Sequence, residues 1–130
     1  MHNGRRKVLV VDDDPFIRTL LVAWLQEVGY SVLTAGDGQQ ALEQVHRERP
    51  DIVLLDLMMP RLDGYGVARW LRERTETKRL PIIVLSADTR ASQKLLGLRV
   101  DGFISKPFDL DEVLARVSEY APLDKVGAAV

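Results

Sequence analysis

The chain has 130 residues, 46% of them hydrophobic, which fits one domain built around one core. Its 18 Lys and Arg residues against 19 Asp and Glu residues give a formal net charge of −1, so the overall charge offers no case for nucleic acid or an anionic membrane as the main partner. The absence of cysteine excludes disulfides, thiolate metal sites and cysteine nucleophiles.

The first predicted strand covers residues 8–11, an apolar run that ends in three consecutive carboxylates, Asp12, Asp13 and Asp14. The basic stretch 1–6 before it is interpreted as an N-terminal extension. Because the apolar run is too short for a signal-peptide core or a membrane span, we expect a soluble, cytoplasmic protein.

A helix should follow at once, because Pro15 suits the first helical position and the aspartate before it suits an N-cap. Apolar residues at three-and-four spacing continue to Gly29, where the helix should stop. A strand over 30–34 and a second helix come next. Asp37 is placed to cap this second helix and Pro50 to end it.

The central stretch, residues 51–64, contains the carboxylate that most needs an explanation. Residues 52–55 form a short run that is apolar on both faces, which predicts a strand buried in a sheet with both sides covered. Asp56 follows directly, and charge at the edge of a core is costly unless it is paired, hydrogen-bonded or bound to a metal. After a loop bounded by proline and glycine, a helix is predicted through 67–71.

The final third repeats the alternation of strand and helix. The predicted elements are a strand over 82–85, a helix over 90–98, a strand over 102–105 and a helix that begins after Asp109. Ser86 and Lys106 directly follow the two strands. Residues 121–130 have no periodicity and are interpreted as a C-terminal tail or a truncated linker, which leaves one domain over 7–120.

Five alternations of strand and helix predict an α/β fold, a doubly wound parallel sheet with helices on both faces. Ligands of such sheets bind beyond the carboxyl ends of the strands. The residues found at those ends are Asp12, Asp13, Asp56, Ser86 and Lys106. One edge of the sheet should therefore collect carboxylates, a hydroxyl and an ammonium.

This set of groups suits phosphoryl chemistry. Carboxylates that gather at one edge need a cation, and ligands that are all oxygen select a hard ion such as Mg²⁺. Lys106 and Ser86 would contact phosphate oxygens. Asp56 could then attack phosphorus in line and become an aspartyl phosphate, without a general base, because a carboxylate is already ionised near neutral pH.

Four motifs, in this order and at these separations, resemble the receiver domain of two-component response regulators. They are Val10-Val11-Asp12-Asp13-Asp14-Pro15, Asp56-Leu57-Met58-Met59-Pro60 with Asp63-Gly64, Ser86-Ala87, and Ser105-Lys106-Pro107-Phe108. The resemblance covers roughly Lys7 to Tyr120. It implies a flavodoxin-like, CheY-like fold with five parallel strands in the order 2-1-3-4-5.

Position by position, the resemblance makes Asp56 the phosphoacceptor and a ligand of Mg²⁺. Asp13 would be a direct Mg²⁺ ligand, and Asp12 would act through a metal-bound water. The main-chain carbonyl of Met58 would complete the protein ligands.

The resemblance also implies a switch. Lys106 would pair with the phosphoryl group, and the peptide bond between it and Pro107 should be cis. Ser86 would be the hydroxyl that moves to a phosphoryl oxygen, and Phe103 the aromatic side chain that turns inward into the vacated space.

The implied partners are proteins. The phosphoryl donor would be a phosphohistidine of a sensor histidine kinase or a histidine phosphotransfer protein in a phosphorelay. The output would be a changed surface on the fourth helix, fifth strand and fifth helix, which controls a partner or an effector domain. A phosphorylation-dependent homodimer is one form that this output could take. The module would be regulatory and not a turnover enzyme, with no direct contact to nucleic acid or membrane.

The sequence departs from the family pattern at two places. Arg99-Val100 replaces a small Gly-Ala pair before the fifth strand, which predicts an atypical end of the fourth helix and a more basic surface there. Phe103 lacks the hydroxyl of the more common tyrosine, so the switch would use packing alone.

Two other functions fit parts of the pattern. A Mg²⁺-dependent phosphatase with an aspartate nucleophile would need an acid two residues beyond Asp56, where this chain has Met58. A receiver-like module that docks without phosphorylation would not need the carboxylates at all. Both are less favoured than the phosphorylated switch.

Several charged side chains have simpler interpretations. The arginines at positions 69, 72, 74 and 79 are interpreted as a solvated face, with a docking role as the less favoured alternative. His46 is interpreted as a solvated helix residue and not as a phosphoryl donor.

Overall fold

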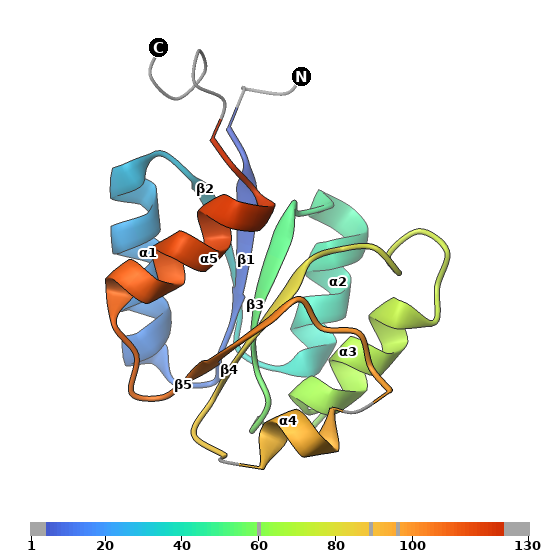
Figure 1. Ribbon diagram of the computed structural model, residues 1–130. Helices are drawn as coiled ribbons and strands as arrows, with labels where there is room; N and C mark the ends of the chain where they lie inside the picture. The colour runs from blue at the N-terminus through green and yellow to red at the C-terminus, as the bar shows by residue number, and fades with distance from the viewer. Residues whose placement is uncertain (1–4, 60, 89, 96, 124–130) are drawn as a thin grey trace.

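A computed structural model of the chain describes residues 5–59, 61–88, 90–95 and 97–123. Its strands are β1 (Lys7–Val11), β2 (Ser31–Ala35), β3 (Ile52–Asp56), β4 (Ile82–Ser86) and β5 (Gly102–Ser105). Its helices are α1 (Pro15–Val28), α2 (Gly38–Glu48), α3 (Gly64–Arg72), α4 (Ala91–Lys94) and α5 (Leu110–Tyr120). The strands form one parallel sheet in the order β2-β1-β3-β4-β5 (Figure 1). The predicted α/β fold and the strand order 2-1-3-4-5 are confirmed.

The sheet separates two apolar cores, one on each face. Helices α1 and α5 cover one face, and α2, α3 and α4 cover the other (Figure 1). Side chains of β1 alternate between them: Val8 and Val10 contribute to the α1 and α5 core, whereas Leu9 and Val11 contribute to the opposite one. All five residues of β3 and of β4 are buried, as expected for central strands covered on both sides.

Aspartates begin four of the helices. In each case a side-chain oxygen of the N-cap accepts a hydrogen bond from a main-chain N–H in the first turn, which satisfies a group that has no partner inside the helix. The four caps are Asp14, Asp37, Asp63 and Asp109. Helix α1 ends at Gly29, whose φ of +116° is a left-handed conformation that favours glycine.

The fourth helix is shorter than predicted. The sequence predicts a helix over 90–98, but α4 covers only Ala91–Lys94. Its main chain leaves the helical region at Leu95, with φ −91° and ψ 3°, and Gly97 adopts a φ of +90°, which no right-handed helix can continue. Leu96, part of the predicted helix, lies outside the described residues.

The prediction that the arginines at positions 69, 72, 74 and 79 form a solvated face is wrong for Arg72. Whereas Arg69, Arg74 and Arg79 are exposed, the side chain of Arg72 is only 9% exposed. Its guanidinium donates to the main-chain carbonyls of Arg99 and Leu80 and pairs with a carboxylate, so it belongs to the structure of the domain and not to a solvated face.

The chain segments at the two ends of the domain lie side by side (Figure 1). Arg6 Nε donates to the carbonyl of Pro122 at 3.2 Å, and the buried Tyr30 hydroxyl donates to the carbonyl of Ala121 at 2.9 Å. Ala121, which was expected in the tail, is thus part of the core, whereas residues 124–130 of that segment lie outside the described residues. No helix in the described part of the chain is long and apolar enough to cross a membrane.

Candidate functional site

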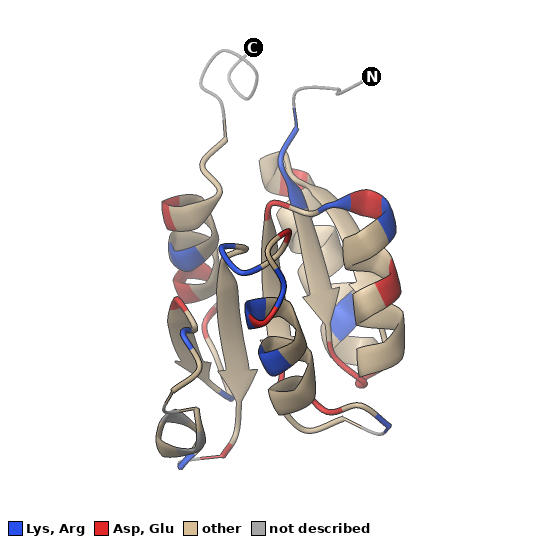
Figure 2. Ribbon diagram, turned by 90° about the vertical axis from the view of Figure 1, so that its right-hand side faces the viewer, with Lys and Arg blue, Asp and Glu red and all other residues tan. Residues whose placement is uncertain are grey.

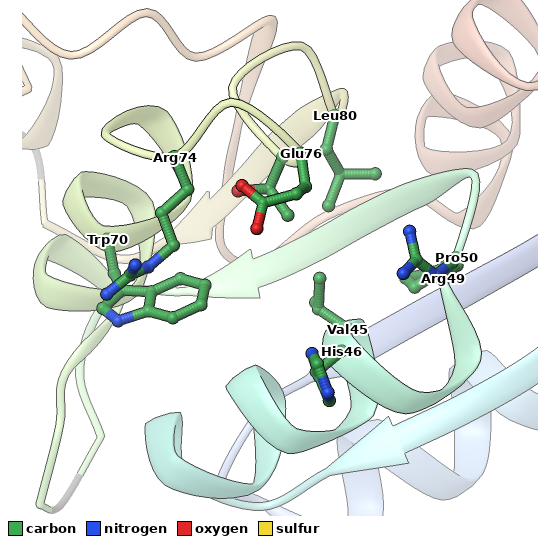
Figure 3. Close-up of a pocket in the computed structure, with 9 residues that line it drawn as sticks. Val45, His46, Arg49, Pro50, Trp70, Arg74, Glu76 and Leu80 are labelled. Carbon is green, nitrogen blue, oxygen red and sulfur yellow. The ribbon is translucent and has the colours of Figure 1, made fainter.

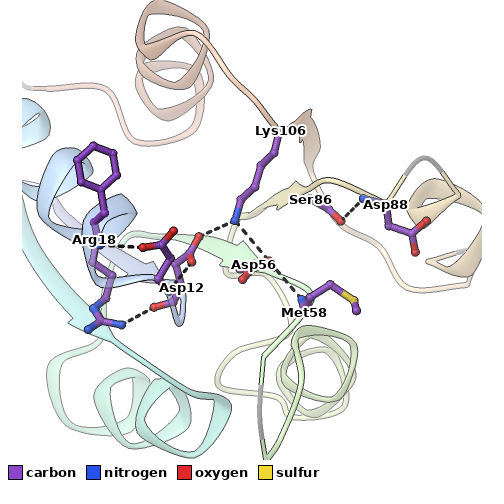
Figure 4. A network of polar contacts seen from close by, with 9 residues as sticks. Asp12, Arg18, Asp56, Met58, Ser86, Asp88 and Lys106 are labelled. Atoms are coloured by element: carbon purple, nitrogen blue, oxygen red, sulfur yellow. Dashed lines mark hydrogen bonds and ion pairs between the residues drawn. The ribbon is translucent and has the colours of Figure 1, made fainter.

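Three carboxylates meet at the carboxyl edge of the sheet. Asp12 follows β1 and is fully buried, Asp56 ends β3 and is 4% exposed, and Asp13 is exposed. One carboxylate oxygen from each lies within 4.8 Å of the others. The register of β1 with β3 pairs Val11 with Leu55, so the residues that follow these two positions emerge at the same level. The predicted gathering of carboxylates is therefore present. Figure 4 shows two of its members, Asp12 and Asp56.

The main chain around Asp56 is held by the loop that follows it. Gly64 N donates to the carbonyl of Leu57 at 3.1 Å. A Cβ at Gly64 would lie 2.3 Å from the main-chain oxygen of Asp56, so only glycine allows this close approach. The Asp56 side chain is oriented by Met58, whose main-chain N–H donates to Oδ1 at 3.2 Å.

Asp12 is fixed by its own turn and by α1. Its Oδ1 accepts from the main-chain N–H of Asp14 at 2.9 Å. Its main-chain carbonyl accepts from Nη1 of Arg18 at 2.7 Å (Figure 4). Arg18 was not among the predicted site residues, because the pattern of an amphipathic helix does not tell how far its polar side chains reach toward the neighbouring strand.

Lys106 projects into the carboxylate cluster. Its Nζ lies 2.8 Å from Oδ2 of Asp12 and 3.7 Å from Oδ1 of Asp56 (Figure 4). The main-chain N–H of Lys106 donates to the carbonyl of Ser86 at 2.9 Å, which continues the pairing of β5 with β4. The peptide bond before Pro107 is cis, as expected.

The cluster opposes the ionisation of Asp56. Burial, followed by the charge of Asp12, raises the pKa of Asp56 to about 6, although Lys106 acts in the opposite direction. Burial alone would lower the pKa of Lys106, but the hydrogen bond with Asp12 and the nearby carboxylate charges outweigh it, and the pKa of the ammonium is raised. One ammonium therefore does not balance the carboxylates.

This donor set fits a hard divalent cation. Three carboxylates within bonding reach of one point supply only oxygen, and Asp13 leaves the cluster open to solvent on one side. Mg²⁺ commonly takes one or two carboxylates and keeps several waters, which suits an open cluster of this kind.

Ser86 and Phe103 lie on the neighbouring strands β4 and β5. Ser86 is 1% exposed at the end of β4, and its Oγ accepts from the main-chain N–H of Asp88 at 3.0 Å (Figure 4). Phe103 is half-buried and packs against the core beneath α2, α3 and α4. It pairs with Val84, two positions before Ser86 along β4. The Met58 side chain is 63% exposed.

A hollow of about 140 Å³, lined by both polar and apolar residues, lies away from this cluster, between the ends of α2 and α3. Val45, Pro50 and Leu80 form part of its lining, with Arg74 stacked 4.0 Å from the centre of the Trp70 ring (Figure 3). His46 is exposed at this hollow, and no predicted site residue lines it.

Comparison with known proteins shows the family to which the chain is related. The family model of the response regulator receiver domain matches residues 8–118. The response regulator MprA of Mycobacterium leprae (strain TN) is 48% identical over 113 residues, which are 85% of this chain and 49% of that protein. The alkaline phosphatase synthesis transcriptional regulatory protein PhoP of Bacillus subtilis (strain 168) is 41% identical over 125 residues, 95% of this chain and 51% of that protein. The chain spans about half the length of the curated relatives that it matches.

The chain is also similar to solved structures of related proteins. The receiver domain of the sensor histidine kinase PA1611 from Pseudomonas aeruginosa PAO1, which carries a magnesium ion coordinated in its active-site cleft, is 31% identical, with a TM-score of 0.83 over 90% of this chain and 98% of that one. The chemotaxis protein CheY4 of Vibrio cholerae is also 31% identical, with a TM-score of 0.83 over 89% of this chain and 98% of that one. With its family match from residue 8 to residue 118, the chain belongs to the response regulator receiver domain family.

Proposed function

We propose that this domain is a phosphorylation-controlled switch, in which Asp56 accepts a phosphoryl group from a phosphohistidine of a sensor kinase or phosphotransfer protein in a Mg²⁺-dependent reaction. One observation carries the proposal: carboxylate oxygens of Asp12, Asp13 and Asp56 lie within 4.8 Å of one another. Lys106 Nζ lies 3.7 Å from Asp56 in the same cluster.

In the proposed transfer, a carboxylate oxygen of Asp56 forms a bond to phosphorus while the phosphorus–nitrogen bond to the donor imidazole breaks. The electron pair of that bond stays on the imidazole nitrogen. Lys106, now bound to Asp12, would pair with a phosphoryl oxygen and stabilise the charge on the transferred group. The nucleophile is the ionised carboxylate of Asp56. At a pH above its pKa of about 6, the group is mostly ionised and can attack without first losing a proton.

The metal would be held by Asp13, Asp56 and the main-chain carbonyl of Met58, with Asp12 acting through a water. When bound, it supplies positive charge to the phosphoryl oxygens. The raised pKa of Asp56 supports this assignment, because a cation among the carboxylates would offset the repulsion from Asp12. The magnesium ion in the PA1611 receiver domain is a further support.

The switch would begin at Ser86. In the proposed phosphorylated state its hydroxyl leaves the N–H of Asp88 and donates to a phosphoryl oxygen. The half-buried Phe103 would turn into the space that Ser86 vacates and change the surface formed by α4, β5 and α5. A partner protein or an effector domain would read this surface, and residues 7–120 would form the functional unit.

A labelling experiment tests the proposal. The chain is incubated with Mg²⁺ and phosphoramidate, whose phosphorus–nitrogen bond resembles that of phosphohistidine, and intact mass is measured. We expect one added phosphoryl group on the wild-type chain and on Asp111→Asn, an exposed aspartate of α5, but none on Asp56→Asn. Labelling of Asp56→Asn to the wild-type level would overturn the proposal.

The phosphatase alternative is less well supported by the same site. The side chain two residues beyond Asp56 is that of Met58, which cannot protonate a leaving group. We therefore expect the small phosphodonor to be consumed slowly, at the rate at which the aspartyl phosphate hydrolyses.

A further inference from the structure

A basic hollow of about 350 Å³ lies at the amino edge of the sheet, opposite the carboxylate cluster. It is formed where the loop between α3 and β4 meets the turn before β5, and it is lined by Arg72, Lys78, Arg79, Arg99 and Asp101. Figure 2 looks onto this side of the molecule, where blue segments gather on α3 and on the loop after it. With a net charge of −1 for the whole chain, such a concentration of cations is local.

Arg72 holds the two walls of the basic hollow together. Its Nε donates to the carbonyl of Arg99 on one wall, and its Nη1 donates to the carbonyl of Leu80 on the other at 2.7 Å. Nη2 donates to Asp101 Oδ2 at 3.0 Å. Because the Arg72 side chain is 9% exposed and makes all three contacts, the loops that carry the other cations are fixed before any ligand binds.

The positive charge of the basic hollow is not neutralised within the domain. Asp101, the one carboxylate among the described lining residues, is already paired with Arg72 and also accepts from the main-chain N–H of Ile82 at 2.8 Å. Among the residues that the structure describes, the side chains of Lys78, Arg79 and Arg99 form no ion pair. Burial lowers the pKa of the Arg72 guanidinium; the charge of Asp101 opposes this shift, and the charge of Arg99 adds to it.

The lining also limits what the ligand can be. Among the described residues, none with an aromatic or aliphatic side chain lines the hollow, so recognition must come from charge and hydrogen bonds. Guanidinium groups bind phosphate oxygens through two parallel hydrogen bonds, and lysine adds a point charge. The volume lies in the range of small-molecule sites, roughly 300 to 1,000 Å³.

We propose that the basic hollow binds a compact polyphosphate, either an inorganic chain or the phosphate chain of a nucleotide, through Lys78, Arg79 and Arg99. Three cations that converge on one hollow match a ligand with several charged oxygens better than a single carboxylate or phosphate. The site is independent of the phosphorylation proposed for Asp56, because it lies at the other edge of the sheet.

The test is a calorimetric titration of the 130-residue chain with inorganic tripolyphosphate at low salt and without divalent metal. We expect saturable binding to one site. The double variant Arg79→Gln/Arg99→Gln should weaken it by roughly a hundredfold, about tenfold for each charge-assisted contact removed. Arg47→Gln, which removes an exposed arginine of α2 outside the hollow, should leave the dissociation constant unchanged. Thermal melting would verify that both variants fold.

Two further titrations identify the source of the phosphates. Equal affinity for ADP and pyrophosphate would support a site that reads the phosphate chain alone, and tighter binding of ADP would support a nucleotide. Absence of saturable binding at millimolar tripolyphosphate, or equal binding by the double variant and the wild type, would overturn the proposal. Tighter binding of hexaglutamate than of tripolyphosphate would also overturn it and assign the hollow to an acidic protein segment.

Discussion

At Asp56, folding moves a carboxyl group into a site that disfavours its charge. Its pKa rises from 3.8 to about 6, first because of burial and then because of the charge of Asp12. A group whose pKa is higher in the folded state binds its proton more tightly there, so its contribution to stability is fully present below about pH 4 and is lost as the pH rises through 6. The loss is about 3 kcal/mol for this side chain, which is almost fully buried.

Replacement of this carboxylate should therefore stabilise the domain in a pH-dependent way. We expect Asp56→Asn to raise the free energy of unfolding at pH 7, without divalent metal, by about 1 to 3 kcal/mol, because the amide carries no charge in the buried site. The gain should disappear near pH 4, where the wild-type carboxyl is protonated. Urea unfolding at a series of pH values measures the gain in free energy of unfolding at pH 7 and its loss near pH 4. A gain in stability of the same size at every pH would contradict the electrostatic explanation.

Asp13 and Asp14 are neighbours with different proposed tasks, which allows a matched test of the metal site. Asp13 belongs to the carboxylate cluster, whereas Asp14 caps α1. We expect Asp13→Asn to weaken Mg²⁺ binding by roughly tenfold or more, because even the loss of an outer-shell partner of a metal ligand typically costs about 10- to 100-fold in affinity. Asp14→Asn should have little effect, because asparagine is an equally good N-cap. Thermal stabilisation by added Mg²⁺ reports the affinity of each variant.

Some of the site residues could be predicted and others could not. Asp56, Asp12 and Lys106 each directly follow a predicted strand, so the rule for parallel sheets brings them together without knowledge of side-chain geometry. The contact of Arg18 with the carbonyl of Asp12 depends on how α1 lies against β1, and no periodicity contains that information.

Among the elements, the segment after β4 differs most from its prediction. The apolar residues after Arg90 suggested a helix to residue 98, but α4 makes a single turn before Gly97 takes a left-handed conformation. Leu95, Leu98 and Val100 still pack on the core beneath α2 and α3. Apolar side chains can therefore reach the core from a bent segment, and their presence alone does not fix the length of a helix.

The segment before β5 is held in place by Arg72 from a different helix. We expect Arg72→Met to lower the free energy of unfolding by about 2 to 4 kcal/mol, because it removes an ion pair with Asp101 and leaves the carbonyls of Leu80 and Arg99 without their side-chain donor. Arg69→Met on the same helix is the matched control. Its side chain is exposed, so we expect a change within about 0.5 kcal/mol in chemical denaturation. Equal effects of the two substitutions would contradict a structural role for Arg72.

For the whole molecule, the alternation of buried strands with amphipathic helices is enough to predict a doubly wound sheet, and the two cores on its faces confirm it. The strand order was inferred from family resemblance, because strands that are apolar on both faces do not reveal their neighbours. The contact of Tyr30 with Ala121 was not predicted, since residues beyond the last helix show no pattern.

The hydrogen bond between Arg6 and Pro122 has a consequence for chain topology. Since these residues touch at the surface, a short glycine-rich bridge could join them, and the chain could be reopened within 73–80 without cutting a helix or a strand. We expect such a circular permutant to keep the far-ultraviolet circular dichroism of the parent and the labelling of Asp56, but to lose the polyphosphate site whose wall has been opened. The polyphosphate site at the amino edge of the sheet would then depend on the natural chain order, whereas the labelling of Asp56 at the carboxyl edge would not.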